Sequence, residues 1–214
     1  MNTLMRCIRK KRGIVGIEAA IVLIAFVVIA AALAYVVINM GFYASQTAKS
    51  TINNGINEAT SALELDGYIT GWTNNVSTVT FLAIPVKLAV GQQQVDMGNN
   101  TVVVAVQGGN FSLANIYTGA NGTANDDVYS LMSLTSNSFN GTTPNAYCYI
   151  YNGISNTVLS QNAKAYIIVW LTNPYGLVPY AKFTVDVRTS VGASLTVQRE
   201  IPGGLPTDTL VNLG

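Results

Sequence analysis

The segment IVGIEAAIVLIAFVVIAAALAYVVI, residues 14–38, decides the architecture of this chain. The twenty residues 19–38 carry no charge. As an α-helix they would rise about 30 Å, which is the thickness of the hydrocarbon core of a bilayer. We therefore expect a helix that is able to span the cytoplasmic membrane and that is inserted there as a precursor.

Five cationic side chains precede this segment, with no acid among residues 1–13: Arg6, Arg9, Lys10, Lys11 and Arg12. By the positive-inside rule, the N-terminus should lie in the cytoplasm and the residues after the helix should lie outside the cell. Moving one Lys or Arg through the centre of a bilayer costs roughly 2.5–3.5 kcal/mol. The basic block would therefore lock the chain in the membrane for as long as it stays attached.

The helical pattern continues into a second, amphipathic part. Apolar residues recur there every three or four positions, at Ala44, Ala48, Ile52, Ile56, Ala59 and Leu63. Asp66-Gly67 is a stop signal. The joint helix would cover residues 15–65 and about 75 Å, which is too long to bury against one domain. It is either a membrane anchor with a stalk or a helix that packs against copies of itself, which its alanines would allow.

From residue 67 the pattern changes to the two-residue period of strands. Residues 180–188 and 194–198 alternate apolar and polar side chains. β-Branched and aromatic runs, separated by Asn-Gly and Gly-Gly turns, occupy residues 78–90, 102–106, 146–151 and 165–171. The polar residues 120–145 should form an exposed loop. The expected fold is α+β, with a long N-terminal helix followed by an antiparallel β-sandwich or barrel.

The composition argues against catalysis and against nucleic-acid binding. The chain has no His, 10% charged residues and two cysteines, Cys7 and Cys148. Residues 14–214 carry six basic and ten acidic groups, a net charge of −4, whereas phosphate recognition needs clustered cations. Asp126-Asp127 is more typical of a solvated loop than of a metal site. We expect no enzyme activity, no cofactor and no bound metal.

Five Asn-x-Ser/Thr sequons fall in the β-rich part: Asn75, Asn99, Asn110, Asn121 and Asn140. Five acceptors in a region expected outside the cell predict some N-glycosylation, with an oligosaccharyltransferase as partner. Glycans would also help to solubilise a surface that is poor in charge.

Four N-terminal motifs point to one family: Arg9-Lys-Lys-Arg-Gly13, the run from Ile14 to Phe26 with an acid at its fifth position, Ala34-Tyr-Val-Val-Ile-Asn-Met-Gly41, and Gln46-Thr-Ala-Lys-Ser-Thr-Ile52. Together they resemble archaeal flagellins (archaellins), whose signal peptide is of the class III, type IV pilin-like kind. The resemblance covers about residues 9–66, and the rest of the chain is similar only as a β-rich outer domain.

The resemblance implies three parts: a cleaved basic leader (residues 1–13), a long helix (14–66) and an exposed outer domain (67–214). It implies cleavage between Gly13 and Ile14 by a membrane-embedded prepilin-type signal peptidase. Assembly would follow at a membrane platform that a separate ATPase motor powers, and copies of the subunit would form an extracellular helical filament that rotates for swimming. An adhesive type IV pilin is the alternative, and a monomeric membrane-anchored binding module is a further one.

Glu18 is the only charged residue between residues 14 and 48. Two interpretations of it stay open. An anion near the start of a helix is favoured by the helix macrodipole. Glu18 could also pair with the amine of Ile14 that cleavage would free, in the same subunit or in a neighbouring one.

Overall fold

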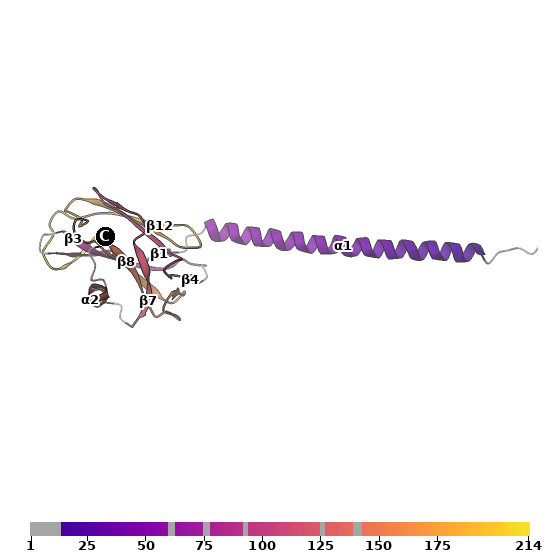
Figure 1. Cartoon of the computed structure of the whole chain (residues 1–214), viewed down its shortest axis with the longest axis horizontal. Coiled ribbons are helices and arrows are strands. Elements are labelled where there is room, and N and C mark those ends of the chain that lie inside the picture. The colour runs from indigo at the N-terminus through magenta and orange to yellow at the C-terminus, as the bar shows by residue number, and fades with distance from the viewer. Residues whose placement is uncertain (1–13, 60–62, 75–77, 92–93, 125–126, 139–142) are drawn as a thin grey trace, which may run out of the picture. The chain divides into compact units, whose positions relative to one another are not determined.

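The structure is a computed structural model that describes residues 14–59, 63–74, 78–91, 94–124, 127–138 and 143–214. The chain divides into two compact units, Met1–Asn53 and Asn54–Gly214. They are described separately below, and Figure 1 labels their helices and strands.

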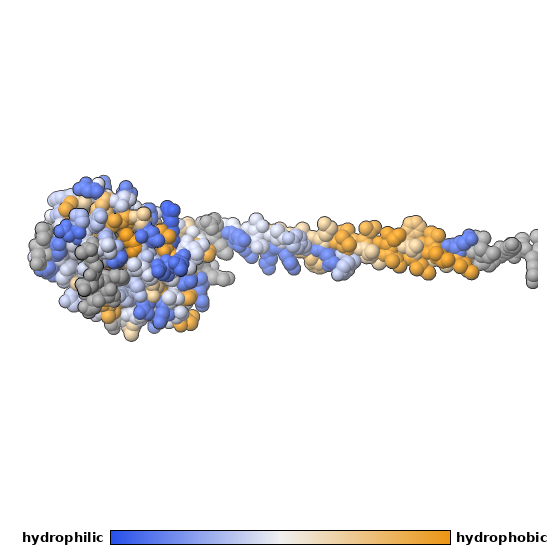
Figure 2. Space-filling model, in the orientation of Figure 1, coloured by the Kyte–Doolittle hydropathy of each residue, from blue (hydrophilic) through white to orange (hydrophobic). Residues whose placement is uncertain are grey.

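The first unit is built on one uninterrupted helix, α1 (Ile14–Ala59), of 46 residues. The segment contains no proline, so no residue interrupts the helical ladder of backbone hydrogen bonds. Figure 2 shows that the N-terminal half of α1 is hydrophobic and that its C-terminal half is largely hydrophilic. The two-part pattern that the sequence predicts is therefore present on a single helix.

The helix ends earlier than the sequence predicts. Leu63, which continues the apolar helical period, lies instead in strand β1 (Leu63–Leu65), where it pairs with Leu88 and is buried. The prediction of a helix to residue 65 is wrong because periodicity cannot distinguish a helical leucine from one that a distant strand recruits into a core.

The second unit is a β-sandwich. Its larger sheet has seven strands in the order β13-β2-β3-β10-β8-β7, with β1 paired to β3. The other strands of this sheet are β2 (Thr70–Thr73), β3 (Val79–Leu88), β7 (Tyr117–Thr123), β8 (Asn145–Tyr151), β10 (Lys164–Trp170) and β13 (Leu210–Asn212). The smaller sheet has the order β12-β11-β5-β6, formed by β5 (Val103–Gln107), β6 (Ser112–Leu113), β11 (Lys182–Arg188) and β12 (Leu195–Glu200). A short ribbon pairs β4 (Val95–Asp96) with β9 (Val158–Leu159).

The main core lies between the two large sheets and follows from period-two alternation. Strand β11 alternates buried side chains with partly or fully exposed ones, and Phe183, Val185 and Val187 are turned inward. They join inward residues of the larger sheet, such as Ile84 and Ile167, in one hydrophobic cluster. The predicted α+β class is confirmed, and each of the six runs that the sequence assigns to strands overlaps one.

The outer face of the larger sheet carries a second core, which helix α2 (Val128–Ser138) covers. Leu131 of α2 is fully buried against Phe81 and Ile168 of the sheet. Asp127 caps the helix, because its Oδ2 accepts hydrogen bonds from the Ser130 N–H and hydroxyl, each at 3.1 Å. These bonds hold the pKa of the Asp127 carboxyl below its usual range.

The expectation that residues 120–145 form a loop is therefore wrong for the part that α2 occupies. The neighbouring β7 is also a departure, since it runs parallel to β8 in an otherwise antiparallel sheet. A parallel pair needs a crossover connection, and α2 provides it. Asn121-Gly122, which the sequence suggests as a turn, lies inside β7; a Cβ on Gly122 would approach Asn156 Oδ1 to 2.7 Å, so glycine fits there.

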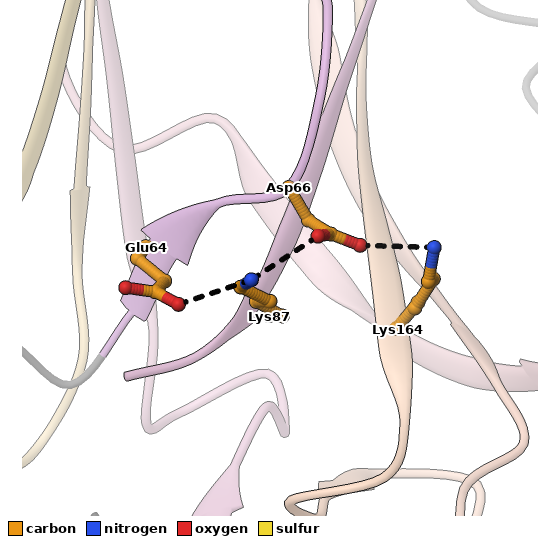
Figure 3. A network of polar contacts seen from close by, with 4 residues as sticks. All are labelled: Glu64, Asp66, Lys87 and Lys164. Atoms are coloured by element: carbon orange, nitrogen blue, oxygen red, sulfur yellow. Dashed lines mark ion pairs between the residues drawn. The ribbon is translucent and has the colours of Figure 1, made fainter. Parts of the chain in front are cut away.

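An ionic network of Glu64, Asp66, Lys87 and Lys164 fastens β1 to the sheet (Figure 3). Lys87 of β3 lies directly opposite Lys164 of β10, and two like charges in that position repel each other. Asp66 compensates this repulsion by pairing with both lysines. Its Oδ1 lies 3.4 Å from Lys87 Nζ, and its Oδ2 lies 3.1 Å from Lys164 Nζ. Glu64 adds a third pair, 3.2 Å from Lys87 Nζ.

These contacts change the pKa of an acidic group, Asp66, and of a basic group, Lys87. Burial acts to raise the pKa of the Asp66 carboxyl, but hydrogen bonding and charge from Lys164 and Lys87 outweigh it, so the pKa is lowered from 3.8. The pKa of Lys87 is raised, first by Glu64 and then by Asp66. Asp66 and Lys87 are therefore both charged at neutral pH.

We predict that Asp66→Asn destabilises the outer domain by about 1 kcal/mol at neutral pH, a value that allows for screening by water. Since the folded pKa of Asp66 lies below the unfolded 3.8, its contribution is present above pH 3.8 and is lost as the pH falls through the folded pKa. The test is urea unfolding of residues 54–214 across this pH range. The difference in free energy of unfolding between Asp66→Asn and wild type should disappear in acid.

Glu200→Gln is the matched control. Glu200 pairs with Lys182 at 4.0 Å, and the two side chains are 53% and 71% exposed, so the change should leave stability near that of wild type. If the difference in free energy of unfolding between Asp66→Asn and wild type stays constant well below pH 3.8, the role given to this network is contradicted.

Candidate assembly surface

The most unusual surface of the molecule extends along α1. Its side chains are exposed from residue 16 to residue 56, including Phe26 at 68% and Tyr43 at 73%. A contiguous apolar surface of this extent is not stable against water. Residues Gly16–Ile56 are long and apolar enough to cross a membrane. The helix therefore needs either lipid or other apolar helices around it.

The C-terminal half of α1 has the features of a helix that packs against protein. Thr51 donates its hydroxyl to the Thr47 carbonyl at 2.9 Å, so this polar group is satisfied within the helix and tolerates removal from water. Gly41 and Gly55 have open space where a Cβ would lie. Small residues of this kind let a neighbouring backbone approach closely.

Glu18 lies near the start of α1, on an otherwise apolar surface. It borders a shallow depression with Ala19, Val22, Leu23, Phe26 and Val27. An ionised carboxylate on a surface that loses its water needs a cationic partner. Ile14 is the first residue of α1, while Gly13 lies outside the described residues. The proposed pairing of Glu18 with Ile14 therefore stays a prediction.

Three of the five sequons lie in described parts of the outer domain. Asn99 follows β4, Asn110 lies in the turn between β5 and β6, and Asn121 lies in β7; all three are exposed. Asn75 and Asn140 lie outside the described residues. The three acceptors are distributed over separate elements, so they form no single site, and each is open to modification.

Within the described residues, the titratable groups form no recognisable catalytic arrangement. No cluster of three or more His, Cys, Asp or Glu side chains could hold a metal ion there. Cys148 is fully buried in the main core, and burial raises the pKa of its thiol to about 12. Tyr117 donates its hydroxyl to the Met97 carbonyl, and burial raises its pKa too. Both groups stay neutral and serve packing. Asp126 lies outside the described residues.

Comparison with known proteins shows which family the chain resembles. Residues 13–199 match the family described as archaeal-type flagellin. The chain is 43% identical to "Probable flagellin 1" of Aeropyrum pernix, over 96% of this chain and all of that protein. It is 30% identical to "Probable flagellin 1" of Archaeoglobus fulgidus, over 92% of this chain and 94% of that protein.

Two solved structures are similar over most of their length. One is the archaeal flagellum of Methanospirillum hungatei, with a TM-score of 0.57 and 27% identity over 88% of this chain and 94% of that chain. The other is the crystal structure of archaeal flagellin FlaB1 from Methanocaldococcus jannaschii, with a TM-score of 0.58 and 17% identity over 72% of this chain and 97% of that chain, which supports the fold alone. With the family match and the relatives, the conclusion is that the chain belongs to the archaeal-type flagellin family.

Proposed function

We propose that this protein is the structural subunit of an archaeal flagellum, polymerising into its helical extracellular filament for swimming. The observation that carries the proposal is the exposed apolar surface of α1 in a chain that matches archaeal-type flagellins over residues 13–199. A polymer of identical subunits can bury a long apolar helix of this kind between neighbouring copies. The protein is not an enzyme.

We further propose that the subunit passes through two environments. As a precursor it spans the cytoplasmic membrane through the apolar half of α1, with residues 1–13 on the cytoplasmic side. A prepilin-type peptidase then cuts between Gly13 and Ile14. Cleavage removes all five cations that precede the apolar run, so the helix can leave the lipid for the filament at an assembly platform with its ATPase motor.

We predict that Gly13→Val blocks this processing. A bulky side chain at the cleavage position should keep the basic block attached, so the protein stays precursor-sized in the membrane and no filament appears. The measurement is an immunoblot of membranes and shed filaments, with N-terminal sequencing of any filament. The conservative Gly13→Ala serves as a size control, with a smaller loss expected. Normal filaments that begin at Ile14 in the valine variant would refute the proposal.

We predict that Glu18→Gln is inserted and processed normally but yields few filaments. The favourable effect of an anion on the helix macrodipole is only about 0.3–1 kcal/mol, so its loss alone would leave assembly largely intact. Loss of a charge pair with the freed Ile14 amine inside an apolar core would cost more, because the amine stays buried without a partner. Glu18→Asp, which keeps the charge, should recover part of the yield. Normal filament yield from the glutamine variant would favour the macrodipole interpretation.

Deleting the gene in the host distinguishes a filament for swimming from an adhesive pilin. Loss of swimming with normal surface attachment, restored by the wild-type gene, is the expected result. A strain that swims normally but attaches poorly would instead identify an adhesive pilin.

The exposed acceptors Asn99, Asn110 and Asn121 make N-glycosylation by an oligosaccharyltransferase part of the same proposal. An intact mass of the filament subunit equal to that of the bare peptide would exclude it.

A further inference from the structure

One sequon lies on a surface that is already shaped by the sheet. Asn121 belongs to β7, which ends the strand order of the seven-stranded sheet, and it is exposed. Its Oδ1 accepts the Gly122 N–H at 2.9 Å. This bond orients the amide group through its oxygen and not through Nδ2, the atom to which an N-linked sugar attaches. A glycan on Asn121 would therefore start from a defined position on the sheet.

A row of tyrosines lies beside this acceptor on the neighbouring strand. Asn121 pairs with Tyr149 of β8, and Thr123 pairs with Tyr151. Paired residues point to the same face of a sheet, and so do residues two positions apart on one strand. Tyr147, Tyr149 and Tyr151 therefore share the outer face of the larger sheet with Asn121.

The three rings have different surroundings. Tyr147 and Tyr149 pack on each other, with ring centroids 5.1 Å apart, and both contribute to the second core under α2. The Tyr147 ring also covers Gly119 of β7, where a Cβ would lie 3.5 Å from the ring. Among the described residues, Tyr151 belongs to neither hydrophobic cluster, and it is partly exposed. The outer face beside Asn121 is thus occupied towards Gly119, whereas Tyr151 flanks it on the other side.

The surface beside Tyr151 is hollowed. A depression of about 470 Å³ begins there, and its lining includes Thr123, Tyr151, Asn152, Ser155 and Asn156. None of the described lining residues carries a charge. The cation opposite Tyr151 in the sheet is Lys164, which is already paired with Asp66. The depression is therefore a polar but uncharged site next to an aromatic ring.

The loop that forms one wall of this depression is held in a fixed shape. Asn152 has a φ of 59°, a left-handed conformation that asparagine tolerates better than most residues. Gly153 packs so tightly that a Cβ would lie 2.6 Å from Ile150 Cγ2. The site is therefore present before any ligand arrives.

An oligosaccharide matches both chemical parts of this surface. The face of a pyranose ring that carries C–H bonds is attracted to the negative face of an aromatic ring. Sugar hydroxyls donate and accept hydrogen bonds, as the amides of Asn152 and Asn156 and the hydroxyl of Ser155 also do. A sugar stacked on Tyr151 would place its hydroxyls beside groups that can pair with them.

We propose that the glycan on Asn121 folds back onto its own subunit, with a sugar ring stacked on Tyr151 and the chain continuing into the depression beside it. In the attachment, Asn121 Nδ2 loses a proton and bonds to the anomeric carbon of the sugar, whose bond to a phosphate of its activated donor breaks. This inference rests on the N-glycosylation proposed above. It adds a specific binding surface for the attached sugars.

The first test measures the exposure of Tyr151 with and without the glycan, in intact filaments from the host. Thr123→Val removes the sequon, whereas Thr123→Ser keeps it. Hydroxyl-radical footprinting read by peptide mass spectrometry should show that oxidation of Tyr151 rises severalfold in the valine variant. It should stay at the wild-type level in the serine variant. Tyr68, 72% exposed and located between β1 and β2, should be oxidised equally in all filaments.

Two further variants control for the position of the lost glycan. Asn121→Gln should raise the oxidation of Tyr151 as Thr123→Val does, because both remove the same sugar chain. Asn99→Gln removes a different acceptor and should leave Tyr151 unchanged. Equal oxidation of Tyr151 in wild type and in Asn121→Gln would overturn the proposal.

The second test asks whether the contact stabilises the outer domain. Asn121→Gln should speed the proteolysis of heated filaments about fivefold, as expected for the loss of one stacking contact with an aromatic ring. In filaments that carry Tyr151→Thr, the same change should have little effect, because the ring is already absent. A glycan that only shields the chain from protease would act equally in both backgrounds, and equal ratios of rates would refute the contact.

Glycopeptide mass spectrometry of wild-type filaments distinguishes this inference from the proposals on which it rests. Sugar on Asn121 is the expected result. Sugar on Asn99 or Asn110 with none on Asn121 would contradict the inference and leave the proposed N-glycosylation intact. Bare peptide at every acceptor would contradict both, whereas wild-type protein that forms no filament would contradict the proposed function.

Discussion

The apolar surface of α1 is the constraint on which the rest of the molecule depends. Every described side chain from residue 16 to residue 56 is exposed, and the N-terminal half of them is almost purely aliphatic and aromatic. Hydrophobic burial is the dominant favourable term in association as well as in folding. A chain that leaves this much apolar area open is therefore incomplete as a monomer in water. Lipid before assembly and neighbouring helices after it are the two environments that the proposed route provides.

The outer domain is suited to this arrangement because it folds around its own core. Two hydrophobic clusters, one between the sheets and one under α2, are formed by described residues of the second unit itself. No disulfide is needed, and Cys148 is simply one more buried residue. The network of Glu64, Asp66, Lys87 and Lys164 secures β1, the first strand after the helix, to the centre of the larger sheet. Strand β1 is therefore held to the larger sheet by both hydrogen bonds and ion pairs.

Sequence patterns predict the parts of this fold that local periodicity determines. The apolar run of α1 and the alternating strands β11 and β12 are visible because each residue's environment repeats at a fixed spacing. The end of α1 and strand β1 are not, since Leu63 fits the helical period and only its pairing with Leu88 assigns it to a sheet. Helix α2 is hidden among turn-forming residues, although Asp127 as its cap and the spacing of Val128, Leu131 and Met132 are signals that could have revealed it. At the candidate site, Gly13, Asn75 and Asn140 fall outside the described residues, and the pairing of Glu18 with Ile14 stays a prediction.

The composition of α1 explains how one segment can serve in both environments. Valine and isoleucine are mediocre helix formers in water, yet they fill the apolar half of the helix. In lipid, an unpaired backbone group costs several kcal/mol, so the helix is enforced there whatever its side chains prefer. The same intrahelical bonds are satisfied inside a bundle of helices, and Thr51 satisfies its hydroxyl within the helix as well. On the proposed route from membrane to filament, α1 would then need no refolding. It exchanges only the atoms that surround the side chains, and lipid tails and packed alkyl groups are similar surroundings. The step that remains costly is the passage of charge, and all the cations before residue 49 belong to residues 1–13.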